Sequence, residues 1–479
     1  MTPPEPVPTL PPPSVDDATL ASETTIASSY GLKRNILSPL ETLAQSISTI
    51  APTTSPTMTI PLVFALAGNA TWLAYLLATA GVLLVGLCVA RFARYSASPG
   101  SLYIYASTLR PAVGAVTAWA LLLAYIATGA SVAGGFIYYA NDLLRQYAGH
   151  SVSPFLLAVF GVAIATAIAY RDVKISARMM LWIEAASVSL IAMVLALLLW
   201  KNGPHIDPGQ FHLRGASASG VRLGVVLALF SFVGFESATT LGAEAREPLR
   251  TIPRAILQSA ALVGVFCIVS AYSEVLGFAK AGQDLRGNVA PLRLLSQQVG
   301  VPVLGPLIDV GALVSMFACI LACVTAAARV LMLMAHNGLA PQRLTRTHPL
   351  NATPGLAIIV VGSLTLIPAA VLAARGVAGS DIYGWMGSLA TYGFITVYGL
   401  VAIALPFYMR KQGHLTAAML LLSAAATAAM ALALVGTLYP VPDPPYNWLP
   451  YFYLVYVAAG LGWFLVRRPA RSRLGTIDH

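Results

Sequence analysis

The sequence predicts an all-α polytopic membrane protein with about 12 transmembrane helices. Hydrophobic residues make up 57% of the 479 residues and charged residues only 10%, whereas soluble domains carry roughly 25% charged residues. About 12 apolar stretches of roughly 20 residues follow one another, each long enough to cross a bilayer as a helix. Lys and Arg lie beside these stretches, as expected for the loops of a multi-pass protein.

The predicted spans begin after a polar, proline-rich segment. Residues 1–31 are expected to be a disordered tail, without the apolar core of a cleavable signal peptide. Residues 280–304 form a longer connection that we expect to hold short helices, and residues 469–479 a short cytoplasmic tail. The spans cover residues 39–67, 72–91, 112–144, 154–170, 177–200, 221–243, 256–278, 305–335, 355–374, 382–408, 415–438 and 448–466.

The charge distribution predicts orientation and excludes several partners. With both termini cytoplasmic, most of the 28 Lys and Arg residues fall on cytoplasmic segments, which fits the positive-inside rule. The basic residues behind the net charge of +10 form no patch, so no nucleic acid partner is expected.

No cysteine lies in an outside loop, so neither a disulfide framework nor a disulfide-linked partner subunit is expected. The lipid bilayer of the cell (cytoplasmic) membrane is the expected surrounding. The four cysteines, all inside apolar runs, are Cys88, Cys267, Cys319 and Cys323.

The sixth span contains the run Phe230-Ser-Phe-Val-Gly-Phe-Glu236. Gly234 is a poor helix former, and Glu236 places a carboxyl group near mid-membrane at a cost of roughly 2.5–3.5 kcal/mol on insertion scales. One interpretation is a broken helix whose free backbone groups and carboxylate line a polar cavity. The other is a glycine kink with a protonated Glu236 bonded to a neighbouring helix. We favour the broken helix.

The first span is interrupted at Ala51-Pro-Thr-Thr-Ser-Pro56. Pro52 disfavours helical geometry at Ala51, and Pro56 removes a further backbone donor. Ser55 is expected to cap a new half-helix with Pro56 in its first position. The interrupted spans are the first and the sixth, five positions apart in the order of spans, so they run in opposite directions. This pattern is typical of inverted-repeat transporters.

The interruptions suit a zwitterion. A helix that ends in the membrane leaves carbonyls for an ammonium group, and one that starts there presents N–H groups to a carboxylate. An amino acid fits both ends, and an amine fits one. At least one of the three phenylalanines in the sixth span is expected to serve packing alone. The expected substrate contacts are Ala51, Thr53, Thr54, Ser55, Phe230, Ser231, Phe232, Val233, Gly234 and Phe235, with Ser131 and Tyr392 from other spans.

Three motifs resemble those of the amino acid–polyamine–organocation (APC) superfamily, in its amino acid permease family. They are Ser231–Glu236 followed by Glu244–Arg254, the loop Pro99–Tyr105, and Arg329 through Asn337-Gly-Leu-Ala-Pro341. The resemblance implies a 5+5 inverted-repeat (LeuT-like) transporter fold with helices one and six broken, plus two extra helices. It spans a permease domain over residues 32–468. The first repeat covers about 39–200, the second about 219–408, and the extra helices about 415–466.

The resemblance also implies roles for acids, with two departures. Members often carry a Gly-rich break in helix one, absent here, and some a helix-five lysine, which Ser187 replaces. Glu236 matches a carboxyl linked to proton coupling or gating. Glu184 is a second candidate, although its place roughly 9 Å past Arg178 favours a structural pair or an interfacial contact. Asp309 and Glu274 lie nearer span ends and are expected to be solvated or paired.

The predicted function is secondary active transport of an amino acid or related amine, driven by protons, with no cofactor and no metal. An exchanger of an amino acid for an amine would need the same cavity and stays an alternative. An intramembrane enzyme is disfavoured, because the spans hold no His-Glu-x-x-His or Gly-x-Ser-x-Gly motif. A non-transporting nutrient sensor is less favoured, since few residues follow the last span.

Overall fold

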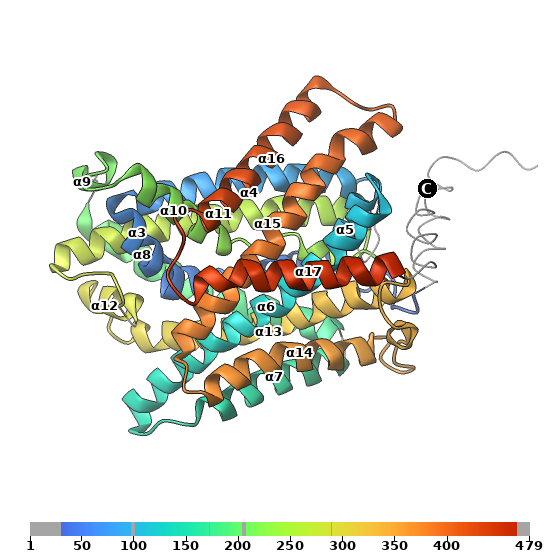
Figure 1. The fold of residues 1–479 in the computed structure, drawn as a ribbon. Helices are drawn as coiled ribbons and strands as arrows, with labels where there is room; N and C mark the ends of the chain where they lie inside the picture. The colour runs from blue at the N-terminus through green and yellow to red at the C-terminus, as the bar shows by residue number, and fades with distance from the viewer. Residues whose placement is uncertain (1–29, 97–100, 172, 204–206, 289, 467–479) are drawn as a thin grey trace, which may run out of the picture.

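The computed structural model describes residues 30–96, 101–171, 173–203, 207–288 and 290–466. Within these residues every regular element is a helix (Figure 1). Ten helical segments of the described chain are long and apolar enough to cross a membrane. The prediction of an all-α polytopic membrane protein is therefore confirmed.

The helices follow one another with short connections. The helices that form the spans, with the parts of interrupted spans given separately, are α2 (Pro39–Ile50), α3 (Ile60–Ala67), α4 (Thr71–Ala93), α6 (Pro111–Leu143), α7 (Pro154–Arg171), α8 (Val173–Asn202), α10 (Ala218–Phe230), α11 (Pro248–Ala281), α13 (Leu304–His336), α14 (Gly355–Ala374), α15 (Gly379–Lys411), α16 (Ala417–Leu438) and α17 (Leu449–Val466). Shorter helices are α5 (Ser101–Ser107), α9 (Pro208–Phe211) and α12 (Pro291–Gln298), the last inside the connection where short helices were expected.

The count of ten differs from the predicted twelve for two local reasons. The first two predicted spans run together as Pro39–Ala93, because a single 3-10 turn, η2 (Gly68–Ala70), joins α3 to α4. The interrupted sixth span leaves α10, which is too short to be counted as a full span.

The long helices pack side by side around α6. Helix α6 lies against α13 and α15, α4 against α11, and α7 against α14. Helices α9 and α12 lie at one end of this bundle and α5 at the other (Figure 1). We refer to these as the α12 end and the α5 end.

The first span is interrupted at the segment around Pro52 and Pro56, as predicted from the sequence. A capping box starts α2, in which Ser38 and Glu41 exchange side-chain to backbone hydrogen bonds. The helix ends at Ile50, and Ala51 takes a left-handed conformation with φ 50°. The prediction that Ser55 caps a new half-helix is wrong. Ser55 is already the first residue of a π-helix, η1 (Ser55–Thr59), and its hydroxyl makes no capping bond.

Helix six also breaks where predicted. Helix α10 ends at Phe230, and the chain turns through Gly234, whose φ is +88°. It continues as a 3-10 helix, η4 (Ser237–Leu241), and not as an α-helix. Glycine adopts such a positive φ without the steric cost that a side chain brings, so Gly234 sets the place of the break.

Candidate functional site

The two breaks lie against each other in the core. The hydroxyls of Thr49 in α2 and Ser237 in η4 are 2.8 Å apart. The backbone N–H of Ala238 donates to the Ser46 hydroxyl at 3.1 Å. A Cβ atom on Gly234 would collide with the Thr49 side chain. The last turns of α2 therefore pack directly on the segment that follows α10.

The break in helix six presents backbone acceptors. Among the hydrogen bonds of the described residues, none ends on the carbonyl oxygens of Ser231 and Val233. The Ser231 hydroxyl lies 3.2 Å from the hydroxyl of Tyr75 on α4. Free carbonyls at the end of a helix carry partial negative charge, so this segment can accept hydrogen bonds from an ammonium group.

The break in helix one presents hydroxyl groups. Its turn uses the N–H groups of Thr54 and Ser55, which donate to Ala51 and Pro52 carbonyls at 2.9 and 3.3 Å. The Thr54 hydroxyl also donates to the Ala51 carbonyl, at 2.7 Å. The Thr53 and Ser55 hydroxyls are buried and have no hydrogen-bond partner among the described residues. The hydrogen-bond donors left free at this break therefore include these two side-chain hydroxyls.

Glu236 is held by two tyrosines. Tyr125 of α6 donates to one carboxylate oxygen at 2.7 Å, and Tyr398 of α15 donates to the other at 2.5 Å. The Tyr398 hydroxyl in turn accepts from the Gly234 N–H at 3.2 Å. Glu236 has no exposed surface. The carboxylate therefore ties the break in helix six to two of the helices that surround it.

The other buried acids differ in their partners. Glu184 accepts a hydrogen bond from Ser315 of α13 at 2.7 Å and is 3% exposed, so its partner lies inside the bundle and not at the membrane interface. Asp309 forms the expected ion pair, with Arg293 of α12. The same expectation for Glu274 is wrong, because it is fully buried and neither carboxyl oxygen has a partner among the described residues.

One of the three phenylalanines borders a cavity. Phe232 and Phe235 are fully buried in the packing, whereas Phe230 lines a cavity of about 200 Å³. The cavity lies between α3, α10, α15 and α16. The rings of Phe230 and Tyr383 meet edge to face at 5.5 Å. Phe230 directly precedes the break in helix six, and the hydroxyl of Tyr383 lies 2.9 Å from that of Thr59, just after the break in helix one. The other polar residues that line the cavity are Ser388, Thr391, Tyr392, Thr437 and Tyr446.

Two candidates from other helices occupy supporting positions. Tyr392 lines the cavity, but its hydroxyl donates to the Thr437 carbonyl at 3.3 Å. Ser131 of α6 donates to the Tyr383 carbonyl at 2.6 Å and so positions the ring that borders the cavity.

Tyrosines around the breaks were not anticipated from the sequence. Tyr139 donates to the Thr57 carbonyl at 3.1 Å, and the hydroxyls of Tyr383 and Thr59 are 2.9 Å apart. A signal existed in the spacing. Tyr125 and Tyr139 lie about four helical turns apart on α6, as do Tyr383 and Tyr398 on α15, which puts each pair on one face. The full set is Tyr75, Tyr125, Tyr139, Tyr383 and Tyr398.

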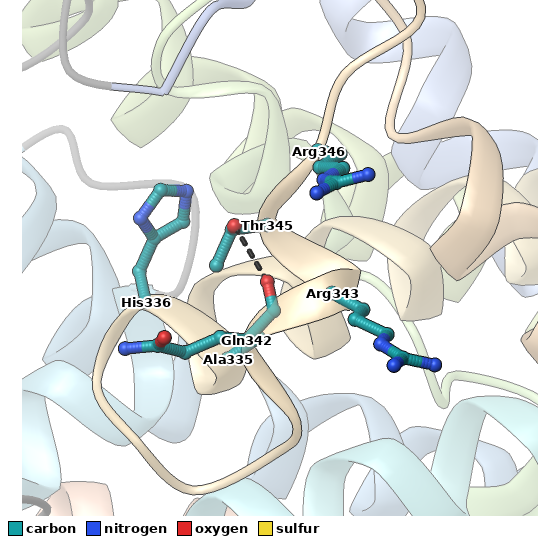
Figure 2. Close-up of a pocket in the computed structure, with 6 residues that line it drawn as sticks. All are labelled: Ala335, His336, Gln342, Arg343, Thr345 and Arg346. Carbon is teal, nitrogen blue, oxygen red and sulfur yellow. Dashed lines mark hydrogen bonds between the residues drawn. The ribbon is translucent and has the colours of Figure 1, made fainter.

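A larger hollow of about 440 Å³ lies at the α5 end, where α13 ends and η5 (Gln342–Thr345) begins (Figure 2). Figure 2 shows the Arg343 and Arg346 side chains pointing away from His336. None of the residues at the two helix breaks lines this hollow, so we do not assign the hollow to the substrate. The described residues hold no group of three His, Cys, Asp or Glu side chains that could bind a metal ion.

Comparisons with known proteins agree with this architecture. The amino acid permease family model matches residues 37–460. The chain is 27% identical over 379 residues to the branched-chain amino acid permease BcaP of Lactococcus lactis subsp. cremoris (strain MG1363), covering 74% of this chain and 81% of that protein. It is 27% identical over 310 residues to the low-affinity putrescine importer PlaP of Escherichia coli (strain K12), covering 61% of this chain and 66% of that protein.

The fold is shared with a solved transporter structure. MhsT in complex with L-phenylalanine aligns with a TM-score of 0.55 at 15% identity, covering 84% of this chain and 99% of that one. The broken helices and this likeness confirm the predicted LeuT-like fold. The match over residues 37–460 establishes that the chain belongs to the amino acid permease family.

Proposed function

We propose that the protein is a secondary active transporter that moves an amino acid or a related amine across the cytoplasmic membrane by alternating access, coupled to protons. One observation carries the proposal. Two interrupted helices meet in the core and leave free carbonyls on one side and unpartnered hydroxyls on the other. Interrupted helices at the repeat interface are where transporters of this kind bind their substrates.

The break supplies both halves of an amino acid site. The carbonyls of Ser231 and Val233 would accept from the substrate ammonium group, and the Thr53 and Ser55 hydroxyls would donate to its carboxylate. An amine would use the carbonyls alone. The relatives support both classes, since one is named for branched-chain amino acids and another for putrescine.

The repeats and the orientation follow from the same proposal. The first repeat covers about 39–200 and the second about 219–408, with α16 and α17 as the extra helices. Basic residues such as Arg246, Arg343 and Arg346 gather at the α5 end, so this end faces the cytoplasm, as do both termini. The cavity beside Phe230 then lies on the path from the outside.

Glu236 and Glu184 are the acids that we assign to coupling or gating. Glu236 ties helix six to α6 and α15 through Tyr125 and Tyr398, and Glu184 joins α8 to α13 through Ser315. Movement of these helices relative to one another would have to break or exchange these hydrogen bonds. A change in the charge of either acid would therefore bias the helix positions.

The test is uptake into proteoliposomes of labelled branched-chain amino acids, phenylalanine and putrescine, with and without an inward proton gradient. Gradient-stimulated uptake of one of these solutes supports the coupled importer. Uptake only into vesicles preloaded with amine or amino acid would favour the exchanger. Absence of uptake by folded protein would contradict transport of these solute classes.

A pair of variants tests the site itself. Thr53→Val keeps the side-chain shape but removes a buried hydroxyl, and we expect a higher KM for amino acids with little effect on amines. Ser189→Ala removes an exposed hydroxyl on α8 and serves as the control. Equal KM values for Thr53→Val and the control would argue against carboxylate binding at this break.

A further inference from the structure

We propose that Glu274 of α11 is a proton-binding residue of the transport cycle, a role that rests on the proton coupling proposed above. Four glutamates are at most 3% exposed. Glu244 is ion-paired with Arg329, whereas Glu274, Glu236 and Glu184 form no ion pair among the described residues. What distinguishes these three acids is the number of hydrogen bonds that each carboxyl group accepts.

Glu236 accepts one bond on each oxygen, and Glu184 accepts one bond in total. Glu274 accepts none from the described residues, although it has no exposed surface. An ionised carboxylate is costly to bury without a partner, and a buried acid without a counter-charge is most stable as the neutral form. Glu274 can therefore gain or lose a proton without breaking a protein hydrogen bond.

The position of Glu274 on α11 connects it to both breaks. The buried face of α11 carries Ser259, Cys267 and Glu274, which follow one another at about two helical turns each. The Ser259 hydroxyl donates to the Phe235 carbonyl in the break of helix six, at 3.3 Å. The Cys267 thiol lies close to the Ser55 hydroxyl in the break of helix one. Glu274 is the next group on this face, towards the α12 end.

An unpartnered hydroxyl lies on the same face. Ser270 is one turn before Glu274 and fully buried, and its oxygen has no hydrogen-bond partner among the described residues. Ser270 and Cys267 thus place polar groups along α11 between Glu274 and the break in helix one. These groups mark a route for a proton between the acid and the substrate site.

The titratable groups that face Glu274 are two tyrosines and a thiol. Tyr75 of α4, Tyr139 of α6 and Cys267 of α11 all lie within electrostatic range of its carboxyl group. None of the ion pairs of the described residues involves Glu274. A bound proton is therefore the available way to balance the charge.

The same two tyrosines touch the breaks. Tyr75 pairs with the Ser231 hydroxyl in helix six, and Tyr139 donates to the Thr57 carbonyl in helix one. A change of charge at Glu274 acts on both rings, and through them on both interrupted helices. Glu274 also lies about two turns before the end of α11 at Ala281, so opening of the α12 end would bring water to it.

The experiment compares Glu274→Gln and Glu274→Asp with the matched control Glu247→Gln, which neutralises an exposed acid at the start of α11. Each purified protein is reconstituted with a pH-sensitive dye inside the vesicles. Two assays use the labelled solute that the unmodified protein takes up. One is accumulation under an inward proton gradient, and the other is exchange against the same unlabelled solute without a gradient.

We expect Glu274→Gln to lose the gradient stimulation and the accompanying proton entry, while exchange is still measurable. Glu274→Asp should keep both activities with a shifted pH profile. Accumulation by Glu274→Gln equal to that of the control would overturn the proposal. So would loss of exchange together with accumulation in a folded variant, since that marks Glu274 as a substrate contact.

Two further outcomes are decisive. If Glu274→Gln does not fold, an unshifted pH profile in Glu274→Asp overturns the proposal, and a shifted one supports it. Absence of gradient stimulation in the unmodified protein would instead contradict proton coupling itself. That result is obtained with the unmodified protein, before any variant is made. Failure of the proposed proton coupling is therefore distinguishable from failure of the proposed role of Glu274.

Discussion

Glu244 and Arg329 form a two-point ion pair that is sealed from solvent at the α5 end. The Arg329 Nε and Nη2 atoms lie 2.6 and 2.8 Å from the two carboxylate oxygens, and both side chains are 1% exposed. The Glu244 carbonyl accepts from the N–H groups of Ile36 and Leu37 at 3.0 and 3.1 Å. One residue therefore joins the segment before α2, the segment after η4, and α13.

Glu244→Gln should destabilise the folded protein strongly, because it leaves the Arg329 guanidinium buried without its counter-charge. Breaking a buried pair in this way costs about 3–5 kcal/mol. The double variant Glu244→Gln with Arg329→Met should recover part of that loss. Thermal unfolding in detergent measures it. Additive losses in the two single and the double variants would mean that the pair is not coupled.

Because this buried pair joins segments at the α5 end, we expect its loss also to change the access of water from that end. We expect a cysteine placed at Leu37, which has no exposed surface, to react faster with a membrane-impermeant thiol reagent in the Glu244→Gln background. The reagent is applied to the purified protein. Equal reaction rates in both backgrounds would contradict a gating role for the ion pair.

Glu236→Gln should leave folding intact and alter the pH dependence of uptake. The amide has one acceptor oxygen in place of two, so only one of Tyr125 and Tyr398 can still donate to an oxygen at this position, and the bond that is lost is worth about 0.5–1.5 kcal/mol. The gate would then no longer respond to ionisation at this position. Initial uptake rates over a range of pH provide the measurement, with gradient-driven accumulation retained.

Tyr125→Phe is the companion variant for this prediction, since it removes one donor and leaves the carboxyl group in place. It should slow uptake and keep the pH dependence. A pH profile for Glu236→Gln that overlays that of the unmodified protein would exclude a coupling or gating role for this acid.

The sequence identified the breaks because their causes are local. Pro52, Pro56 and Gly234 restrict the backbone at their own positions, and neighbours along the chain do not change that. The hydrogen-bond partners of the buried acids could not be predicted in this way, because they come from distant parts of the chain. Tyr125 and Tyr398 are 111 and 162 residues away from Glu236, and only the packing of α6 and α15 against the break brings them together.

Glu274 shows a second limit of position-based reasoning. Its place near the end of an apolar run suggested contact with water or a counter-charge. Helix α11 extends to Ala281, and the adjacent Gly277 lies against Leu295 of α12 and Leu198 of α8. These contacts cover the end of the helix. How deeply a residue is buried in the helix bundle thus depends on the helices that pack over it. The hydropathy of a single span carries no information about those neighbouring helices.

Gly234→Ala should reduce uptake sharply, because the residue combines a φ of +88° with close packing on Thr49. A left-handed conformation costs a residue with a side chain roughly 1–2 kcal/mol, and the new Cβ would also collide with Thr49. Adding Thr49→Ala should relieve only the collision. Uptake and thermal stability of the single and double variants separate the two contributions.

Gly462→Ala is the matched control for this series. It lies in α17, where an added Cβ meets nothing within 4 Å, so we expect normal uptake. Gly234→Leu should abolish uptake altogether. Normal uptake by that variant would mean that the break in helix six lies elsewhere.

Arg293 connects three elements at the α12 end, and the acids on either side should contribute unequally. Its guanidinium pairs with Asp142 of α6 at 2.7 Å and with Asp309 of α13. Burial lowers the pKa of Arg293, but its hydrogen bonds to both carboxylates and their charges hold the pKa above its ordinary value. The guanidinium of Arg293 therefore stays cationic in the physiological range.

Asp309→Asn should cost more stability than Asp142→Asn, because the Asp309 side chain is 1% exposed and that of Asp142 is 27% exposed. Loss of the buried partner approaches the 3–5 kcal/mol range, about the cost of leaving one charge of a buried pair uncompensated. Solvent at Asp142 screens the other pair and makes its loss smaller. Unfolding temperatures of the two variants measure the order, and a larger loss for Asp142→Asn would mean that α12 is held mainly by α6.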